Sequence, residues 1–377
     1  VEDPKTAKGI VKREVVRIVT PGTNLDTQAL DETKNNYIMC IVYIADRYGV
    51  AIADISTGDY FVTELPDSSR LMDEIYKFSP SEIICNEAFY MSGMDLDAMR
   101  DKLGITIYSL DSWYFDDAVC KDKLLEHFKV KNFAGLGLAD YDCGIISAGA
   151  LLIYLFETQK NSLSNLTHIT PYITGKYMLI DSSTRRNLEL CETLREKQKR
   201  GSLLWVLDKT RTAMGARTLR KNVEQPLIDK SEINRRLDAV EELNMNYISR
   251  EEICDQAIAR EEIREYLSPV YDLERLITKI TYGSANPRDL TAFKGSLEML
   301  PPIRYILQDL QAPLLKEIYE DLDALEDLCE LVTKAIREDP PLAMKEGNII
   351  RDGYNEEVDK LRRAKSDGKD WLAKLEN

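Results

Sequence analysis

Three aspartates near the ends of predicted strands could together hold metal ions. They are Asp46, Asp54 and Asp59. Several carboxylates that converge on two divalent cations can activate water and cut a phosphodiester bond. Asp46 and Asp59, however, also fall in predicted hairpin turns, where Asp is a favoured residue type. Asp54 alternates with Ile52 and Ile55, which favours the open side of a strand. Because no further acid is placed convincingly on the next parallel strand, we favour structural turns over a nuclease site.

A second possible chemistry is nucleotide binding, but the sequence contains no string of the form G-x-x-x-x-G-K-[ST]. Such a loop cradles phosphates with backbone N–H groups, while its Lys contacts the β- and γ-phosphates. The nearest glycine-rich string runs from Gly135 to Gly137 and lacks a third spaced glycine. It is more simply a turn into the helix expected to begin near Cys143. We therefore predict no catalytic residue, no bound cofactor and no ATPase activity for this chain.

The strongest positive charge lies in residues 185–221, which hold eleven basic and four acidic residues. Because Arg and Lys neutralise phosphates, weak contacts with a DNA backbone are predicted here. The residues expected to make them are Arg195, Lys197, Lys199 and Arg200. The alternative is an amphipathic packing surface, since seven aliphatic residues interleave with the charges between 188 and 207. Trp205 could stack on a base, but it lies in the apolar string LLWVL, so we favour a core position for it.

The composition, 44% hydrophobic and 31% charged residues, is typical of a globular protein. There is no apolar run of roughly 18 residues that could span a membrane, and the first residues do not have the basic-then-apolar pattern expected of a signal peptide. Seven cysteines, none in a C-x-x-C pair, predict reduced and buried thiols in a cytosolic protein. His127 and His168 are the only histidines, which argues against a His-based metal site. A chain of net charge −15 is not expected to hold nucleic acid strongly by itself.

The predicted elements of the first half form a mixed α/β domain. Residues 36–65 contain three consecutive strands joined by tight turns, which predicts an antiparallel meander. Helices then alternate with strands at 81–87 and 105–110, and a helix follows near 143–160. This order predicts a mixed sheet covered by helices, and it resembles an RNase H-like sheet. We place the domain at 25–160 and expect it to fold alone.

The other segments lie on either side of this domain. Residues 1–24, with a predicted strand at 11–19, are expected to be the tail of a preceding domain and a linker. A polar linker is predicted at 161–176. From 177 to 377, apolar residues recur at i, i+3, i+4 and i+7, which predicts an all-α region. Its last segment, 354–377, is predicted to be a long polar helix or a helical hairpin. It has no capping signal at its end, so a cut end is expected there.

Five strings resemble segments of the MutS family of DNA mismatch repair proteins. They are REVVRIVTPGT at 13–23, DSSTRRNLEL at 181–190, LLWVLDKTRTAMGARTLRKNVEQPL at 203–227, DLERLITKITYGSANPRDL at 272–290 and GNIIRDGYNEEVDKLR at 347–362. They occur in the family's order at compatible distances. One departure is Gly347-Asn348, where two glycines are common.

The resemblance implies a mismatch-recognition tail at 1–24, a connector domain at 25–160 and a helical core with the start of a lever helix at 177–377. The mismatch-reading domain, the DNA clamp and the ATPase would lie outside the chain. It also implies that the full-length protein recognises mismatched double-stranded DNA with ATP and Mg²⁺, as a homodimer in the cytoplasm and on the nucleoid. The segment itself would transmit signals between clamp, ATPase and the partner MutL.

The resemblance further implies that MutL docks on the connector domain. We predict the contact at Lys121, Asp122 and Lys123, near the exposed N-terminal end of a helix expected at 121–128. An ordinary solvated helix end remains an alternative for these three positions. The rival interpretation of the whole chain is a free-standing RNase H-like nuclease with a helical appendage, which would require a converging carboxylate cluster.

Overall fold

The computed structural model describes residues 14–26, 29–172, 175, 177–244 and 255–375. Contacts divide the chain into two compact units, Val1–Asp229 and Lys230–Asn377. The first unit contains a β-sheet with its covering helices, whereas the described part of the second is helical. A mixed-sheet α/β domain followed by a helical region, as predicted, is therefore confirmed.

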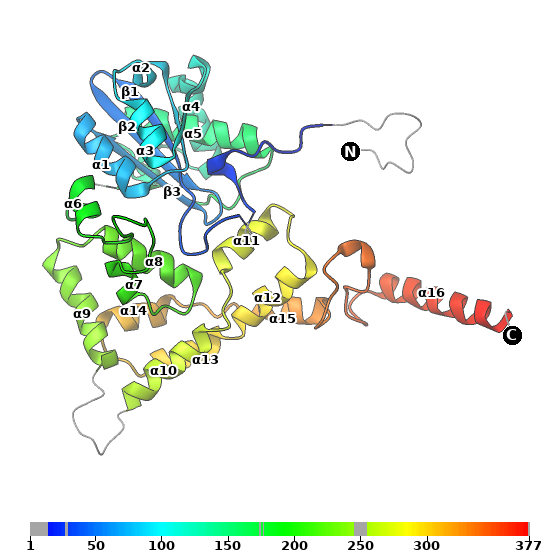
Figure 1. Cartoon of the computed structure of the whole chain (residues 1–377). Helices are drawn as coiled ribbons and strands as arrows, with labels where there is room; N and C mark the ends of the chain where they lie inside the picture. Colours follow the sequence, from blue (N-terminus) through cyan, green and yellow to red (C-terminus); the bar gives the residue numbers. More distant parts are fainter. Residues whose placement is uncertain (1–13, 27–28, 173–174, 176, 245–254, 376–377) are drawn as a thin grey trace. The chain divides into compact units, whose positions relative to one another are not determined.

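Six strands of the first unit form one mixed sheet in the order β5-β4-β1-β2-β3-β6, of which β1, β2 and β3 are labelled in Figure 1. They are β1 (Ile38–Ile44), β2 (Arg47–Asp54), β3 (Asp59–Leu65), β4 (Glu82–Cys85), β5 (Thr106–Ser109) and β6 (Thr170–Pro171). The first three strands are the predicted antiparallel meander. β4 runs parallel to β1, β5 parallel to β4, and β6 parallel to β3. The first five strands have the predicted RNase H-like arrangement.

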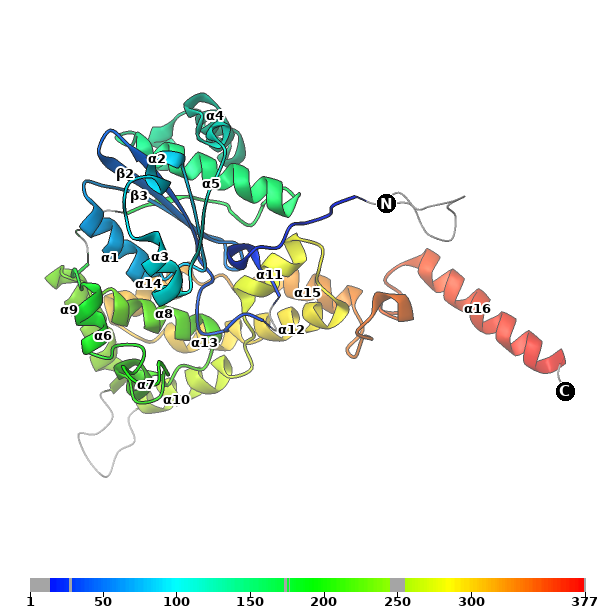
Figure 2. The same cartoon turned by 45° about the horizontal axis from the view of Figure 1, so that its top comes forward.

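Helices cover both faces of the sheet (Figure 2). They are α1 (Ser68–Phe78), α2 (Glu87–Tyr90), α3 (Leu96–Leu103), α4 (Asp117–Phe128) and α5 (Cys143–Gln159). β1 is apolar on both faces because it is central. Its Met39 and Ile41 share a core with Leu71 and Ile75 of α1 and with Met99 of α3. α5 packs on β1 and β2, and α4 packs on α5.

The close approach of α4 and α5 depends on a glycine inside α5. A Cβ atom added at Gly149 would lie 2.3 Å from Cys120 Cβ and 2.5 Å from Cys120 Cα of α4. No side chain fits in that space, so the two helices can only pack at this distance with glycine at position 149.

The first unit also contains α6 (Ser182–Asn187), α7 (Leu203–Leu207) and α8 (Ala213–Glu224). An antiparallel bridge joins Tyr177 to Leu227. Two contacts link this part to the segment before β1: Arg217 donates to the Glu32 carbonyl (2.9 Å), and Lys34 pairs with Glu192 (2.8 Å). Residues 177–229 therefore belong to the first compact unit.

The second unit packs its helices around two apolar clusters. The helices are α9 (Lys230–Asn244), α10 (Asp255–Leu267), α11 (Leu273–Thr281), α12 (Pro287–Leu297), α13 (Leu300–Leu307), α14 (Pro313–Asp321), α15 (Glu326–Ala335) and α16 (Glu356–Leu375). One cluster joins α9, α10, α13 and α14. The other joins α11, α12 and α15. Arg362 of α16 bonds to the Ile350 carbonyl (3.0 Å) and pairs with Asp352, which attaches the start of α16 to the preceding turn.

Two local features differ from prediction. Residues 14–19 are not a strand, and the Ile18 N–H donates to the Thr158 carbonyl (2.7 Å) instead of to a neighbouring strand. Apolar alternation made 11–19 a strand candidate, but a strand also needs a partner for its backbone; residues 11–13 lie outside the described residues. The predicted linker at 161–176 supplies β6.

Two sequence predictions concern the environment of the chain. Five cysteines are buried and unbridged, as predicted: Cys40, Cys85, Cys120, Cys143 and Cys191. Cys329 is half-buried, and Cys254 lies outside the described residues. In the described part of the chain, no helix combines the length and apolar character needed to cross a membrane.

Candidate nucleic-acid interface and partner surface

The open position expected for Asp54 is wrong: this residue, at the end of β2, is fully buried, and both of its carboxylate oxygens accept hydrogen bonds from the protein. Its Oδ2 accepts from Asn35 Nδ2 (2.9 Å) and from the Asn36 N–H (3.0 Å). Its Oδ1 accepts from the N–H (2.8 Å) and the hydroxyl (2.7 Å) of Ser56. This carboxylate therefore fixes the turn between β2 and β3, and these four donors occupy the lone pairs that a cation would need.

The other two aspartates do not complete a metal site around Asp54. Asp59 is its cross-strand neighbour and accepts from the same Asn35 amide (3.1 Å). Asp46 lies in the turn at the opposite end of β2, where it accepts from the Tyr43 hydroxyl (2.8 Å). Within the described residues, no three His, Cys, Asp or Glu side chains gather as a metal site would require. The geometry supports the interpretation of these aspartates as turn residues.

The glycine pair at 135–137 forms a short turn. Residues Phe133–Leu136 make a 3-10 helix, capped by Asn132 Oδ1, which accepts from the Gly135 N–H (3.1 Å). Gly137 ends it in the left-handed region at φ 71°. Its N–H points to the Ala134 carbonyl (3.1 Å), so it is not directed outward as in a phosphate-binding loop.

The predicted MutL-contact residues lie inside α4 and not at its beginning. The helix begins at Asp117, and Asp116 caps it by accepting from the Val119 N–H (3.0 Å). Sequence reasoning began the helix at 121 and missed this Asp cap. Lys121 pairs with Asp117 (2.7 Å). Asp122 is exposed.

Lys123 is the most enclosed of these three residues. Its ammonium lies 4.1 Å from the centre of the Phe156 ring and 3.4 Å from Glu126. A cation over an aromatic face is stabilised by the ring quadrupole. Lys121 and Asp122 are therefore more available to a partner than Lys123.

The basic loop that precedes α7 presents most of its predicted phosphate-contacting side chains to solvent. Arg195, Lys197 and Arg200 are exposed. The loop is held by backbone bonds from Thr193 N to Gln198 O (3.0 Å) and from Lys197 N to Thr193 O (3.1 Å). The three exposed cations can therefore interact with an anionic surface without any change in the core.

Lys199 is instead paired with Asp208. Burial raises the pKa of Asp208, but hydrogen bonds from Lys199 and Thr210 more than offset this and hold that pKa below its ordinary value. Asp208 thus stays ionised and neutralises Lys199. Two further cations of the basic stretch are engaged within the unit: Arg217 is buried, and Arg220 pairs with Glu224 (3.3 Å).

The core position predicted for Trp205 is wrong, because 48% of this residue is exposed. α7 is only five residues long, and Leu204 alone is fully inserted into the small core with Leu190 and Cys191. The neighbouring Val206 is also exposed. An apolar string predicts burial only when the helix is long enough, and covered on enough sides, to bury more than one face.

Sequence reasoning missed a buried polar cluster around Glu82 of β4, which is fully buried. Its carboxylate accepts from Tyr154 OH (2.6 Å), Tyr108 OH and the Gly22 N–H (2.8 Å). Burial and the hydrogen bond to Glu82 raise the pKa of Tyr108, so the phenol stays a donor. The available signal was an acid inside the apolar strand SEIIC. The cluster fastens residues 20–23 to the sheet.

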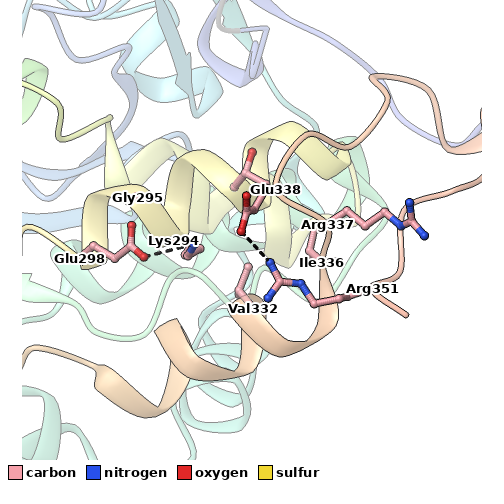
Figure 3. Close-up of a pocket in the computed structure, with 9 residues that line it drawn as sticks. Lys294, Gly295, Glu298, Val332, Ile336, Arg337, Glu338 and Arg351 are labelled. Atoms are coloured by element: carbon pink, nitrogen blue, oxygen red, sulfur yellow. Dashed lines mark hydrogen bonds and ion pairs between the residues drawn. The ribbon is translucent and has the colours of Figure 1, made fainter. Parts of the chain in front are cut away.

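A small pocket of about 130 Å³ lies between α12, α15 and the segment around Arg351 (Figure 3). Lys294 pairs with Glu298 (3.2 Å), and Arg351 pairs with Glu338 (3.1 Å). Its charged walls are therefore internally compensated, and nothing in its lining selects an anion or a cation.

These features define a class of protein with an RNase H-like α/β domain, whose strand-end aspartates lie in turns, followed by a basic loop and helical segments. Two family models match the chain: MutS domain II over residues 36–170 and MutS domain III over residues 183–375. The chain belongs to the MutS family.

Curated relatives are similar over the whole chain. The DNA mismatch repair protein MutS of Lachnoclostridium phytofermentans is 58% identical over 376 residues, which cover 100% of this chain and 39% of that protein. The proteins of the same name from Acetivibrio thermocellus and Caldanaerobacter subterraneus are 46% and 47% identical, again over 100% of this chain and over 42% of their own length. The chain thus spans about two fifths of the length of these relatives.

Proposed function

We propose that this chain is the connector and core portion of a protein that recognises mismatched DNA in an ATP-dependent manner. The observation that carries the proposal is the succession of MutS domains II and III along the chain. In this role the segment passes conformational signals between the DNA clamp, the ATPase and MutL. Helices suit the task, because their backbone bonds are internal and they move as rigid bodies.

ATP and Mg²⁺ would bind the larger protein outside this segment, and the larger protein would work as a homodimer in the cytoplasm, on the nucleoid when bound to DNA. The support for this placement is that the chain has no phosphate-binding string. Phosphate release from ATP by the purified chain should stay at the level of a blank. Turnover that follows the protein through purification would contradict the proposal.

We further propose that MutL docks on α4, with Lys121 and Asp122 as the accessible contacts and Lys123 beside them. Charge reversal at a rim changes mainly the association rate. Lys121→Glu/Lys123→Glu should slow association with immobilised MutL in surface plasmon resonance. The matched control is Lys334→Glu/Lys345→Glu, at exposed positions of the second unit.

The two arms of this experiment separate the residue claim from the docking claim. If the α4 variant associates with MutL at an unchanged rate, Lys121, Asp122 and Lys123 are not part of the contact. Absence of binding by the unsubstituted chain, and also by a full-length relative, would remove the docking claim.

A further inference from the structure

We propose that the carboxyl edge of β1, β4 and β5 is a docking surface for a basic protein segment that carries an apolar anchor side chain. These three strands are neighbours and run parallel, with Ile41 opposite Cys85 and Cys85 opposite Ser109. The segments that follow them must therefore emerge at one edge of the sheet, where open α/β sheets present binding surfaces.

Large apolar side chains are exposed on all three of these segments. Ile44 ends β1 and is 43% exposed, Tyr90 and Met91 follow β4 at 37% and 75%, and Trp113 follows β5 at 47%. An aromatic and aliphatic surface of this kind, with a polar rim, is typical of protein-binding sites.

The surface is already ordered in the absence of a partner. Asn86 joins the ends of β1 and β4, since its side chain accepts from the Tyr43 N–H (3.1 Å) and donates to the Tyr43 carbonyl (3.1 Å). Trp113 stacks on Tyr114 with ring centres 3.9 Å apart, and the Tyr114 hydroxyl donates to Glu157. Little side-chain entropy therefore remains to be lost at Asn86 and Trp113 on binding, which favours affinity.

Charge identifies the kind of partner. Residues 43–46, 86–93 and 110–119 contain five acids and no Lys, Arg or His. Asp46, Glu87 and Asp111 are exposed, and no described basic side chain lies within ion-pair distance of them. Arg100 donates to the Tyr90 hydroxyl (3.1 Å), but it pairs with Asp97 (2.9 Å), so the three acids leave the rim negative. Such a rim repels nucleic acid and attracts lysine or arginine. It also opposes a symmetric contact with a second copy, which would place acid against acid.

The surface adjoins the MutL contact proposed at Lys121, Asp122 and Lys123, because its range 110–119 includes Asp117, which pairs with Lys121 (2.7 Å). Its apolar anchor residues are different ones, and its test requires no repair partner. The probe is a short fluorescein-labelled peptide of lysines with leucine and phenylalanine, titrated with the whole chain and followed by fluorescence anisotropy. Trp113→Ala should weaken binding roughly tenfold. Trp205→Ala is the matched control, because Trp205 is 48% exposed but lies in α7, directly after the basic loop.

Two further arms test the anchor and the rim. Met91→Ala should also weaken binding, and Glu87→Gln/Asp111→Asn should lower both the affinity and its dependence on salt. Circular dichroism and the thermal midpoint establish that each variant is folded.

Three results would overturn the proposal. The first is that the peptide does not bind, and the second is that a peptide with Glu in place of Lys binds equally well. The third is an equal loss of affinity in Trp113→Ala and Trp205→Ala. Self-association that disappears in Trp113→Ala would assign the surface to a second copy and reject a basic partner.

Discussion

Asp54 holds the β2–β3 turn through four hydrogen bonds, two of them from backbone N–H groups. Removing a buried acceptor leaves its donors unsatisfied, so Asp54→Ala should lower the free energy of unfolding by about 2–4 kcal/mol. Asp46→Ala is the control, because Asp46 is exposed and should cost less than about 1 kcal/mol. Urea unfolding of both variants measures the difference. Equal costs, or stabilisation of the unsubstituted chain by Mg²⁺ that Asp54→Ala loses, would argue for a different role of Asp54.

The buried thiols give a prediction with a defined pH dependence. Burial raises the pKa of Cys85, Cys120 and Cys191 to about 12. Unfolded thiols ionise near pH 8.5. The folded state therefore binds these protons more tightly, and the resulting stability is complete below about pH 8.5 and is lost as the pH rises towards 12.

Iodoacetamide at pH 8.5 should accordingly leave the five buried cysteines unmodified in the folded chain and modify them in urea. Half-buried Cys329 should react faster than these five. Mass spectrometry of tryptic peptides gives the rate for each site. Rapid labelling of Cys120 in the folded chain would show that α4 and α5 separate readily.

Most of the side chains that could contact DNA phosphates were identified from the sequence. Which of them are free of ion pairs within the protein was not. Arg195, Lys197 and Arg200 are exposed as a phosphate contact requires, whereas Lys199 pairs with Asp208, nine residues further on. Such pairing depends on the fold of the loop, which no periodicity reveals. Glu82 was missed for the same reason, since its partners come from residues 22, 108 and 154.

At the scale of elements, two glycines in helix interiors should respond oppositely to the same change. Gly149→Ala places a Cβ against Cys120 of α4 and should lower the free energy of unfolding by roughly 1–3 kcal/mol. Gly295→Ala in α12 meets no atom within 4 Å and should raise it by about 0.5–1 kcal/mol, because Ala favours the helix. Chemical denaturation of both variants measures the two changes. A neutral Gly149→Ala would mean that the helices can move apart at no cost.

Elements were predictable where the chain carries a complete local signal. The β1–β3 meander has apolar runs and tight turns, and β4 and β5 alternate with amphipathic helices. The strand proposed at 11–19 had the alternation but no pairing partner along 14–19. β6 has only two residues, Thr170 and Pro171, and exists because β3 lies beside it. Pairing between distant segments leaves no periodic pattern in a short stretch.

For the whole molecule, the charge distribution predicts weak DNA binding without mismatch preference. Three exposed cations at Arg195, Lys197 and Arg200 oppose a net charge of −15. Matched and mismatched duplexes should bind equally, and substituting the three with alanine should reduce the slope of log affinity against log salt by about 3. Fluorescence anisotropy over a salt series measures the slope.

The control for DNA binding is alanine at Lys316, Lys334 and Lys345, three exposed positions of the second unit. An equal loss of slope in the control would mean that binding is spread over the surface. A mismatch preference at physiological salt would place a mismatch-reading function in this segment.

The late position of β6 in the chain has a consequence for how the sheet forms during protein synthesis. β3 ends at Leu65, but β6, which pairs with Phe61 and Val62 on its outer edge, begins only at Thr170. Tyr172 adds a backbone bond to the Val62 carbonyl (3.0 Å). Until about a hundred residues after β3 have been synthesised, the backbone groups on this edge have no partner strand and can pair with other nascent chains. In a polypeptide shortened to 25–160, the edge of β3 would stay unpaired after folding. Its solubility should therefore improve when it is extended to Tyr172.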